Sequence, residues 1–214
     1  MSANDLSKLY LVLDAGPQAE SRLQAALAGA RPSVVLLTPP HGKALDAASV
    51  LPLIDIAQAS DVAVMLADDA QLVRTTRADG VHLRWSNDIS ARAAEAREIL
   101  GNHFMLGVDV GHSRHDAMVI GEAGADYIAF GISEHAEDRE AARALRAELC
   151  HWWGEVFEVP CVAFNVESAV EAEALAAMGA DFVAVRLPPA AASDDLRLFV
   201  SDLAQRLATI ADAA

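Results

Sequence analysis

Aromatic residues, lysine, cysteine and long apolar runs are all scarce in this chain. Only 5% of the 214 residues are aromatic although 53% are hydrophobic, so the core must be built mostly from Ala, Val, Leu and Ile. No apolar run approaches the ~20 residues needed to cross a bilayer, and the N-terminus lacks the basic and apolar regions of an export signal. The two cysteines, Cys150 and Cys161, lack the spacing of a metal site. These absences predict a reduced, cytoplasmic protein without a membrane partner.

Positive charge is scarce as well. The formal net charge of −15 argues against a nucleic acid or an anionic membrane as partner, because such a chain repels phosphate groups. Lysine occurs only as Lys8 and Lys43. Lys8 precedes the first apolar run and Lys43 lies in a loop, whereas a Schiff-base enzyme built on a barrel needs a lysine near the end of an inner strand. Schiff-base chemistry is therefore not expected.

What the chain does contain is a repeated pattern. The string "ADGVHLR" at 78–84 is echoed by "ADYIAFG" at 125–131 and "ADFVAVR" at 180–186. The last two follow a glycine, as expected where a helix ends before a buried strand. These echoes predict a repeated helix–strand unit. Read in this way, the chain yields eight short apolar runs, at 9–13, 33–38, 62–67, 80–84, 104–110, 127–132, 160–166 and 182–187.

Ala-rich segments with helical periodicity lie between these runs, for example at 88–100 and 168–178. Continuous β-branched runs are typical of parallel strands that are covered on both faces. Eight strand–helix units of about 25 residues each predict a single (β/α)8 TIM barrel, an α/β fold, over residues 1–214. The alternative is an open doubly wound sheet, but that fold usually has a Gly-rich loop after its first strand, and "VLDAGPQAE" supplies none.

Several further strings follow one another along the chain. They are "LYLVLD" at 9–14, "RADGVHLR" at 77–84, "AREILGNHFMLGVDV" at 96–110, "GEAGADYIAFG" at 121–131, and "VPCVAFN" followed by "MGADFVAV". In this order they resemble the thiamine-phosphate synthase family, which includes a thiazole-tautomerase branch, over nearly the whole chain. The resemblance implies the barrel fold. It also implies a reaction that joins a pyrimidine-methyl pyrophosphate to a thiazole phosphate and releases pyrophosphate with the help of Mg²⁺.

The resemblance also implies where the family's functional groups are kept and where they are replaced. Its Gln-Leu-Arg-x-Lys after the second strand aligns with 36–40, where Thr-Pro-Pro removes both cations. Its Asn-Asp after the third strand becomes Ala67-Asp68, which keeps one carboxylate. Asp68 is therefore a candidate catalytic residue. The candidate Mg²⁺ ligands are Asp68, Asn87 and Asp88, since carboxylate and amide oxygens suit that ion.

Later loops differ further from the family. After the fifth strand, Asp109 aligns with a serine of the family. After the seventh strand, Asn165 replaces the first residue of a Gly-Gly pair that lies close to phosphate in the family. The family's Thr-x-Thr-Lys loop after the sixth strand has no counterpart in "SEHAEDREAA". The tautomerase branch uses a histidine after the fifth strand, and His112 lies one position beyond it. His112 is a candidate acid–base catalyst, and Lys43 is a candidate phosphate cation that folds over the mouth.

Arginines at the barrel mouth are good binders of phosphate or carboxylate. Arg84 and Arg186 are therefore candidate ligand-binding residues, together with Asp109 and Asn165. Their alternative is an ion pair with a loop acid such as Asp109 or Asp14. Other candidates also have structural alternatives: Asp68-Asp69 and Asn87-Asp88 as helix caps, His82 as a core residue, His115 and Glu134-His135 as surface groups, and Trp152-Trp153 as packing or oligomer contacts.

Two functions of different classes remain. The first is an enzyme of thiamine-phosphate synthase type that acts on phosphorylated heterocycles with Mg²⁺. The second is a non-catalytic barrel that binds or senses a small molecule with a phosphate or carboxylate group. Replacement of the strand-2 cations and of the strand-6 loop favours loss or change of the family's reaction. The expected partner is a small molecule in both cases, and self-association into a homo-oligomer stays open.

Overall fold

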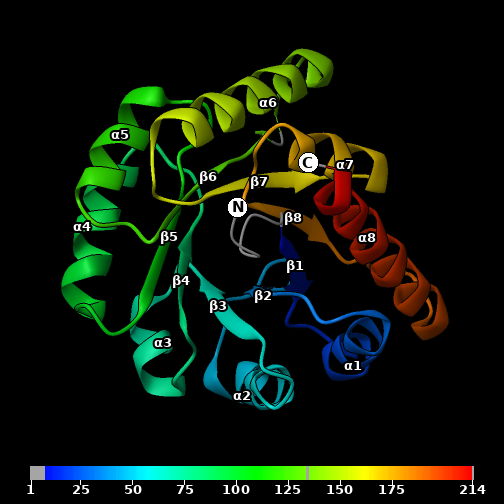
Figure 1. The fold of residues 1–214 in the computed structure, drawn as a ribbon. Coiled ribbons are helices and arrows are strands. Elements are labelled where there is room, and N and C mark those ends of the chain that lie inside the picture. Colours follow the sequence, from blue (N-terminus) through cyan, green and yellow to red (C-terminus); the bar gives the residue numbers. More distant parts are fainter. Residues whose placement is uncertain (1–7, 134, 214) are drawn as a thin grey trace.

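The structure is a computed structural model that describes residues 8–133 and 135–213. Strands and helices alternate through the whole of this part (Figure 1). The strands are β1 (Lys8–Asp14), β2 (Val34–Thr38), β3 (Ala63–Ala67), β4 (Gly80–Leu83), β5 (Met105–Asp109), β6 (Tyr127–Phe130), β7 (Cys161–Val166) and β8 (Phe182–Arg186). The helices are α1 (Ala19–Gly29), α2 (Ala47–Gln58), α3 (Ala70–Thr76), α4 (Ile89–Leu100), α5 (Arg114–Glu122), α6 (Arg139–Val156), α7 (Ala169–Ala177) and α8 (Ser193–Ala213).

The strands form one closed parallel barrel in chain order. Closure is seen at β1, where Leu11 is in register with Val35 of β2 on one side and with Val185 of β8 on the other. The helices surround the barrel as an outer ring, in which α8 packs against both α1 and α7 (Figure 1). The (β/α)8 prediction is therefore confirmed, and the open doubly wound sheet is wrong.

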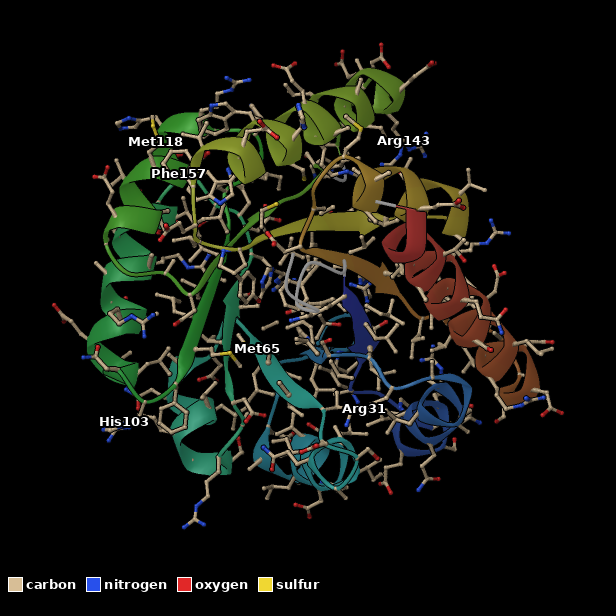
Figure 2. The ribbon with its side chains drawn as sticks, viewed as in Figure 1. Arg31, Met65, His103, Met118, Arg143 and Phe157 are labelled. Carbon is tan, nitrogen blue, oxygen red and sulfur yellow. The ribbon has the colours of Figure 1, made fainter. Side chains whose placement is uncertain are left out.

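The continuous apolar runs arise because the barrel has two cores. Along β1, Leu9, Leu11 and Leu13 pack under the helices, while Tyr10 and Val12 fill the barrel interior. Both sets of side chains are removed from water, so every strand position favours an apolar residue. Figure 2 labels Met65, whose side chain belongs to the interior core, and Arg143, which lies on the outer helix α6.

The helices bury one stripe each. In α4 the buried side chains are Ile89, Ala93, Ala96 and Leu100, a spacing of three or four residues that places them on one face. This helix ends at Gly101, whose φ of 61° favours glycine. None of the helices in the described ranges is long and apolar enough to cross a membrane.

One glycine of the barrel wall is required by an interior side chain. A Cβ at Gly107 of β5 would overlap the ring of Tyr127 on β6. The Tyr127 hydroxyl in turn forms hydrogen bonds of 2.9 Å to the hydroxyl of Tyr10 and to Nδ1 of His82. The barrel interior thus contains a polar chain of three side chains, whose space depends on a glycine in the neighbouring strand.

Lys8 is the first residue of β1 rather than a residue before it, which corrects the prediction. Its Nζ lies 5.6 Å from the ring centroid of Phe182, at the start of β8. Because Lys8 opens its strand, it lies at the end of the barrel opposite the carboxyl ends. Lys8 is therefore not near the carboxyl end of an inner strand, where a Schiff-base lysine would be needed.

Candidate functional site

A cavity of about 550 Å³ lies at the carboxyl ends of the strands. Its size suits a small-molecule ligand, and in TIM barrels this face carries the active site. The lining side chains come from the ends of the strands, the loops that follow them, and the first turn of α4. They are Leu36, Thr38, Asp68, Arg84, Trp85, Arg92, Asp109, Ile132, Ser133, His135, Phe164, Asn165 and Arg186.

Asp68 follows β3 directly and is held by two arginines. Its carboxylate accepts hydrogen bonds from the backbone N–H of Arg84 at 2.9 Å, from Nε of Arg84 at 2.5 Å and from Nη2 of Arg92 at 2.8 Å. Burial alone would raise the pKa of Asp68, but these hydrogen bonds together lower it below its ordinary value. Asp68 is therefore an ionised group whose two oxygens both have cationic partners.

Arg186, the last residue of β8, joins three strand ends. Its Nη1 donates to Oδ1 of Asp14 at 2.5 Å and lies 3.4 Å from Oγ1 of Thr38, which itself donates to Asp14 at 2.6 Å. Asp14 ends β1 and Thr38 ends β2, so these contacts connect three adjacent strands of the closed barrel. Half of the Arg186 side chain, 51%, stays exposed. The predicted alternative of an ion pair with Asp14 is confirmed.

Asp109, the last residue of β5, is a buried carboxyl group that has no cationic partner among the described residues. Its Oδ1 accepts hydrogen bonds from the backbone N–H groups of Gly111 at 2.8 Å and Gly131 at 3.2 Å. No described arginine, lysine or histidine forms an ion pair with it. Burial raises the pKa of Asp109 to about 6, although the two amides act in the opposite direction. The predicted alternative of an ion pair between Arg84 and Asp109 is wrong, because Arg84 binds Asp68 instead.

Asn165 and the buried Arg146 shape the wall at β7. Asn165 has a positive φ of 58°, and its Oδ1 accepts a hydrogen bond from the backbone N–H of Ile132 at 3.0 Å. Arg146 of α6 donates from Nη1 to the carbonyl groups of Phe164 at 2.6 Å and Asn165 at 3.1 Å, and from Nη2 to Glu171 at 2.5 Å. These bonds hold the end of β7, and thereby Asn165, in place.

His82 lies in the interior beside the cavity wall. It is fully buried and stacks on Phe164 with ring centroids 4.7 Å apart, which confirms the predicted packing role. Burial lowers the pKa of His82 to about 4, so the ring is neutral near pH 7. Nε2 has no hydrogen-bond partner among the described residues.

The structure brings together the four predicted ligand-binding residues and Asp68, the predicted catalytic residue and metal ligand. Asp68, Arg84, Arg186, Asp109 and Asn165 all line the mouth cavity. Lys43, His112, Asn87 and Asp88 are exposed and are not part of its lining, although each lies in a loop after a strand. His135 lines the cavity, His115 is exposed on α5, and Glu134 lies outside the described residues.

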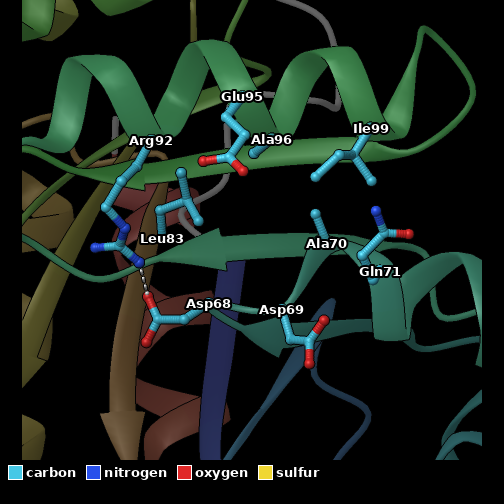
Figure 3. A pocket seen from close by; sticks show the side chains of 9 residues that line it. All are labelled: Asp68, Asp69, Ala70, Gln71, Leu83, Arg92, Glu95, Ala96 and Ile99. Carbon is cyan, nitrogen blue, oxygen red and sulfur yellow. Dashed lines mark hydrogen bonds and ion pairs between the residues drawn. The ribbon is translucent and has the colours of Figure 1, made fainter.

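Trp85, Thr38 and Arg92 are among the lining residues that were not predicted to contribute. Trp85 lines the cavity and is 47% exposed, Thr38 bonds Asp14, and Arg92 binds Asp68. One pattern could have indicated Arg92: a cation in the first turn of a helix is unfavourable with respect to the helix dipole and therefore suggests an acidic partner. Figure 3 shows Arg92 reaching from α4 to Asp68, beside a smaller pocket of about 170 Å³ between α3 and α4.

The predicted helix caps are partly correct. Asp69 caps α3, because its side chain accepts a hydrogen bond from the backbone N–H of Leu72 at 2.8 Å. Asp88 occupies the cap position of α4, but its carboxylate accepts no bond from the helix, which corrects the predicted capping role. A hydrogen bond from Ser86 lowers the pKa of Asp88 instead. Trp153 is buried and stacks on Phe157, as expected for packing of α6.

The donors implied for Mg²⁺ do not fit that ion as they are arranged. Both oxygens of Asp68 are bound by arginines, and Asn87 and Asp88 are exposed outside the cavity lining. Within the described ranges, no group of three or more acidic, histidine or cysteine side chains could hold a metal. A hard divalent cation needs several free oxygen ligands. No step of the function proposed below therefore depends on Mg²⁺.

Comparison with known proteins gives a consistent result. The family model described as thiamine monophosphate synthase matches residues 9–187. The thiamine-phosphate synthase of Erythrobacter litoralis is 39% identical over 210 residues, which cover 94% of this chain and 96% of that protein. That of Rhodospirillum centenum is 42% identical over 130 residues, which cover 61% of each chain.

Among solved structures, the thiamine phosphate pyrophosphorylase of Pyrococcus furiosus superposes with a TM-score of 0.73 at 20% identity and covers 98% of this chain and 99% of that one. A 3-hexulose-6-phosphate synthase superposes with a TM-score of 0.69 at 17% identity and covers 93% of this chain and 99% of that one. At these identities the structural matches show the barrel fold alone. The family match over residues 9–187, together with the full-length similarity to the Erythrobacter litoralis protein, shows that this chain belongs to the thiamine monophosphate synthase family.

Proposed function

We propose that the barrel mouth binds a small anionic metabolite through Arg84 and Arg186, and that the family's transfer reaction is lost or strongly slowed. The observation that carries this proposal is the double binding of Asp68 by Arg84 and Arg92. According to the resemblance, Asp68 is the one carboxylate of the family's site that this chain keeps. Here this carboxylate serves to fix two guanidinium groups at the cavity.

The two proposed anion-binding arginines lie on opposite sides of the mouth. Arg84 follows β4 and Arg186 ends β8, and these strands are four positions apart in a closed ring of eight. Arg84 uses its Nε for Asp68, and Arg186 uses its Nη1 for Asp14 and Thr38. The remaining N–H groups of each guanidinium have no hydrogen-bond partner in the described part of the chain. They provide the fork geometry that suits phosphate or carboxylate.

Loss of transfer activity is supported by what stands at the other strand ends. Thr38 and Pro39 occupy the segment where the resemblance implies cations, and Lys43 is exposed outside the cavity lining. Removal of one electrostatic donor typically lowers an enzymatic rate by about 10²–10³-fold. Several donors are replaced together, so the remaining arginines are not expected to compensate.

A second candidate is an active thiamine-phosphate synthase with a rearranged site. The similarity to the Erythrobacter litoralis protein, which extends over 96% of that protein, favours it. Under this alternative, substrate binding would move Arg84 or Arg92 from Asp68 and free the carboxylate. The cytoplasmic location and the organisation as one domain over residues 1–214 remain predictions under both candidates.

An enzymatic assay distinguishes the two candidates. The purified chain is incubated with the pyrimidine-methyl pyrophosphate, the thiazole phosphate and Mg²⁺, and pyrophosphate release is followed. We expect no turnover above background. Turnover at the ordinary enzymatic scale of about 1–10³ s⁻¹ would overturn the proposed loss and favour the second candidate.

Anion binding is tested separately by calorimetric titration with inorganic phosphate. We expect Arg84→Ala and Arg186→Ala each to weaken binding by about 10-fold, the usual effect of removing a hydrogen bond to a charged group. Arg74→Ala is the matched control, because Arg74 is exposed in the last turn of α3, at the opposite end of the barrel. Equal affinities in all four proteins would refute the assignment of these arginines.

A further inference from the structure

Within the part of the chain that the structure describes, Asp109 differs from Asp68 and Asp14 at the mouth because it has no guanidinium partner. Asp68 binds Arg84 and Arg92, and Asp14 binds Arg186. Asp109 is only 8% exposed, lines the same cavity and is bonded by two backbone amides, both of which contact Oδ1. A buried carboxylate without a compensating cation is costly, so its presence at a ligand cavity calls for a partner.

The backbone near Asp109 is built to admit this carboxyl group. A Cβ at Gly131 would overlap Oδ2 of Asp109 and would lie 2.9 Å from Oδ1 of Asn165. Glycine at position 131 therefore allows both side chains to lie against the end of β6. The same glycine donates its N–H to Oδ1, which fixes the orientation of the carboxyl group. The position of Asp109 is thus determined by the barrel wall.

We propose that the mouth ligand is zwitterionic: its anionic group binds Arg84 and Arg186, and a protonated nitrogen donates to the carboxylate of Asp109. This inference rests on the proposed anion-binding function and adds a cationic group to the proposed ligand.

The distribution of charge at the cavity supports a dipolar ligand. The positive charges of Arg84 and Arg92 are partly neutralised by the ion pairs with Asp68. That of Arg186 is neutralised by its ion pair with the neighbouring Asp14. Asp109 adds one further negative charge at β5. Among the described residues, guanidinium N–H groups without partners therefore lie at β4 and β8, and a carboxylate without a cation lies at β5. A ligand with two phosphate groups would place a second anion near Asp109, whereas a ligand with one anion and one ammonium group satisfies both regions.

The experiment uses two probes that differ in a single ammonium group, phosphoethanolamine and ethyl phosphate. Both are titrated into the full chain at pH 7.5 by calorimetry. We expect phosphoethanolamine to bind about 10-fold more tightly than ethyl phosphate, as is typical of one charge-assisted hydrogen bond. In Asp109→Asn we expect the two affinities to become equal, because the ammonium group of phosphoethanolamine loses its carboxylate partner. The amide retains an oxygen for the Gly111 and Gly131 N–H groups, so this variant should fold.

Two controls separate the possible failures. Asp55→Asn removes one carboxylate from the exposed face of α2 and should keep the preference for phosphoethanolamine. Arg84→Ala should weaken binding of both probes. If the unsubstituted chain binds both probes equally and Arg84→Ala weakens both, the anion site stands and the zwitterion proposal is wrong. If neither probe binds at millimolar concentration, the anion-binding function fails, and the zwitterion proposal fails with it.

Discussion

Asp68 and Arg84 hold each other through two hydrogen bonds, one from the backbone N–H of Arg84 and one from its Nε. Arg84 immediately follows β4, so its N–H would otherwise be free to extend the ladder with β3. Asp68 instead turns away from the strand with a φ of 62°, in the left-handed region that aspartate tolerates better than most residues. The side chain of Asp68, at the end of β3, thus ends the pairing of β4 with β3.

We predict that Asp68→Asn increases anion affinity. The amide cannot neutralise Arg84 and Arg92, so both guanidinium groups become available to a ligand. Phosphate affinity should rise several-fold, while the free energy of unfolding should fall by about 1 kcal/mol, because the Arg84 side chain is 56% exposed and the pair is screened. Titration with phosphate and urea denaturation measure the two effects. Weaker phosphate binding in this variant would contradict the prediction and would mean that fixing the two guanidinium groups contributes more to anion binding than the charge of Asp68 opposes.

Asp109→Asn should change how stability depends on pH. The folded-state pKa of Asp109 is about 6, above its ordinary 3.8, so the folded chain holds the proton more tightly than the unfolded chain. The resulting stabilisation is complete below pH 3.8 and is lost as the pH rises through 6. The unfolding free energy of Asp109→Asn, relative to the unsubstituted chain, should therefore increase by roughly 2 kcal/mol between pH 4 and pH 7.

Urea denaturation across this pH range gives that difference directly. Subtraction of the two curves removes titrations common to both proteins, including that of His82, whose lowered pKa gives a slope of opposite sign. Charged and titratable groups that line the same cavity also act on Asp109; they are Asp68, Arg84, Arg92, His135 and Arg186. A difference that does not vary with pH would mean that Asp109 titrates normally in the folded chain.

Arg146→Met should strongly destabilise the barrel. The Arg146 side chain is 1% exposed, and its removal takes from the Phe164 and Asn165 carbonyl groups a buried donor. Among the described residues, the Glu171 carboxylate would keep only Arg143 and the backbone N–H of Glu167 as partners. Breaking such a buried ionic group typically costs about 3–5 kcal/mol. Arg143→Met on the same helix is the control, since Arg143 is 41% exposed and should contribute less than about 1 kcal/mol. Similar losses in the two variants would contradict the assigned role of Arg146.

Gly131→Ala should destabilise the fold by displacing two side chains at the mouth. The new methyl group would displace the side chains of Asp109 and Asn165, and overpacking of this kind costs typically about 1–3 kcal/mol. Gly16→Ala is the matched control, because its nearest neighbour would be Cβ of Pro40 at an ordinary 3.5 Å. Thermal denaturation compares the two variants. A Gly131→Ala chain as stable as Gly16→Ala would show that Asp109 moves without cost.

Periodicity and apolar runs predicted the barrel because they report burial, which all eight strands share. The predicted ends of the strands were less accurate, because side chains at the mouth compete for the backbone N–H groups there. The run 127–132 predicted a longer strand than β6, which ends at Phe130. The N–H groups of Gly131 and Ile132 bond the side chains of Asp109 and Asn165 instead of the neighbouring strand. Local sequence cannot reveal acceptors that lie 22 and 33 residues away.

The candidate site was predictable only in outline. Position at the end of a strand, or just after it, identified Arg84, Arg186, Asp109 and Asn165 as mouth residues, because the carboxyl ends of all strands meet at one face of a parallel barrel. The same rule included Lys43 and His112, which are exposed outside the cavity lining. Ion-pair partners depend on side-chain direction and on contacts between loops. For this reason the binding of Arg92 to Asp68 and the burial of Asp109 became visible only in the structure.

The close packing of Gly107 against Tyr127 limits the order in which substitutions can accumulate in a lineage. Position 107 cannot gain a side chain until residue 127 becomes smaller, because the two would occupy the same space. A smaller residue at 127, however, leaves Tyr10 and His82 without the hydroxyl that joins them. A descendant that carries alanine at 107 should therefore also differ at 127, and at 10 or 82. Changes at these positions are therefore expected to occur together in related sequences rather than independently.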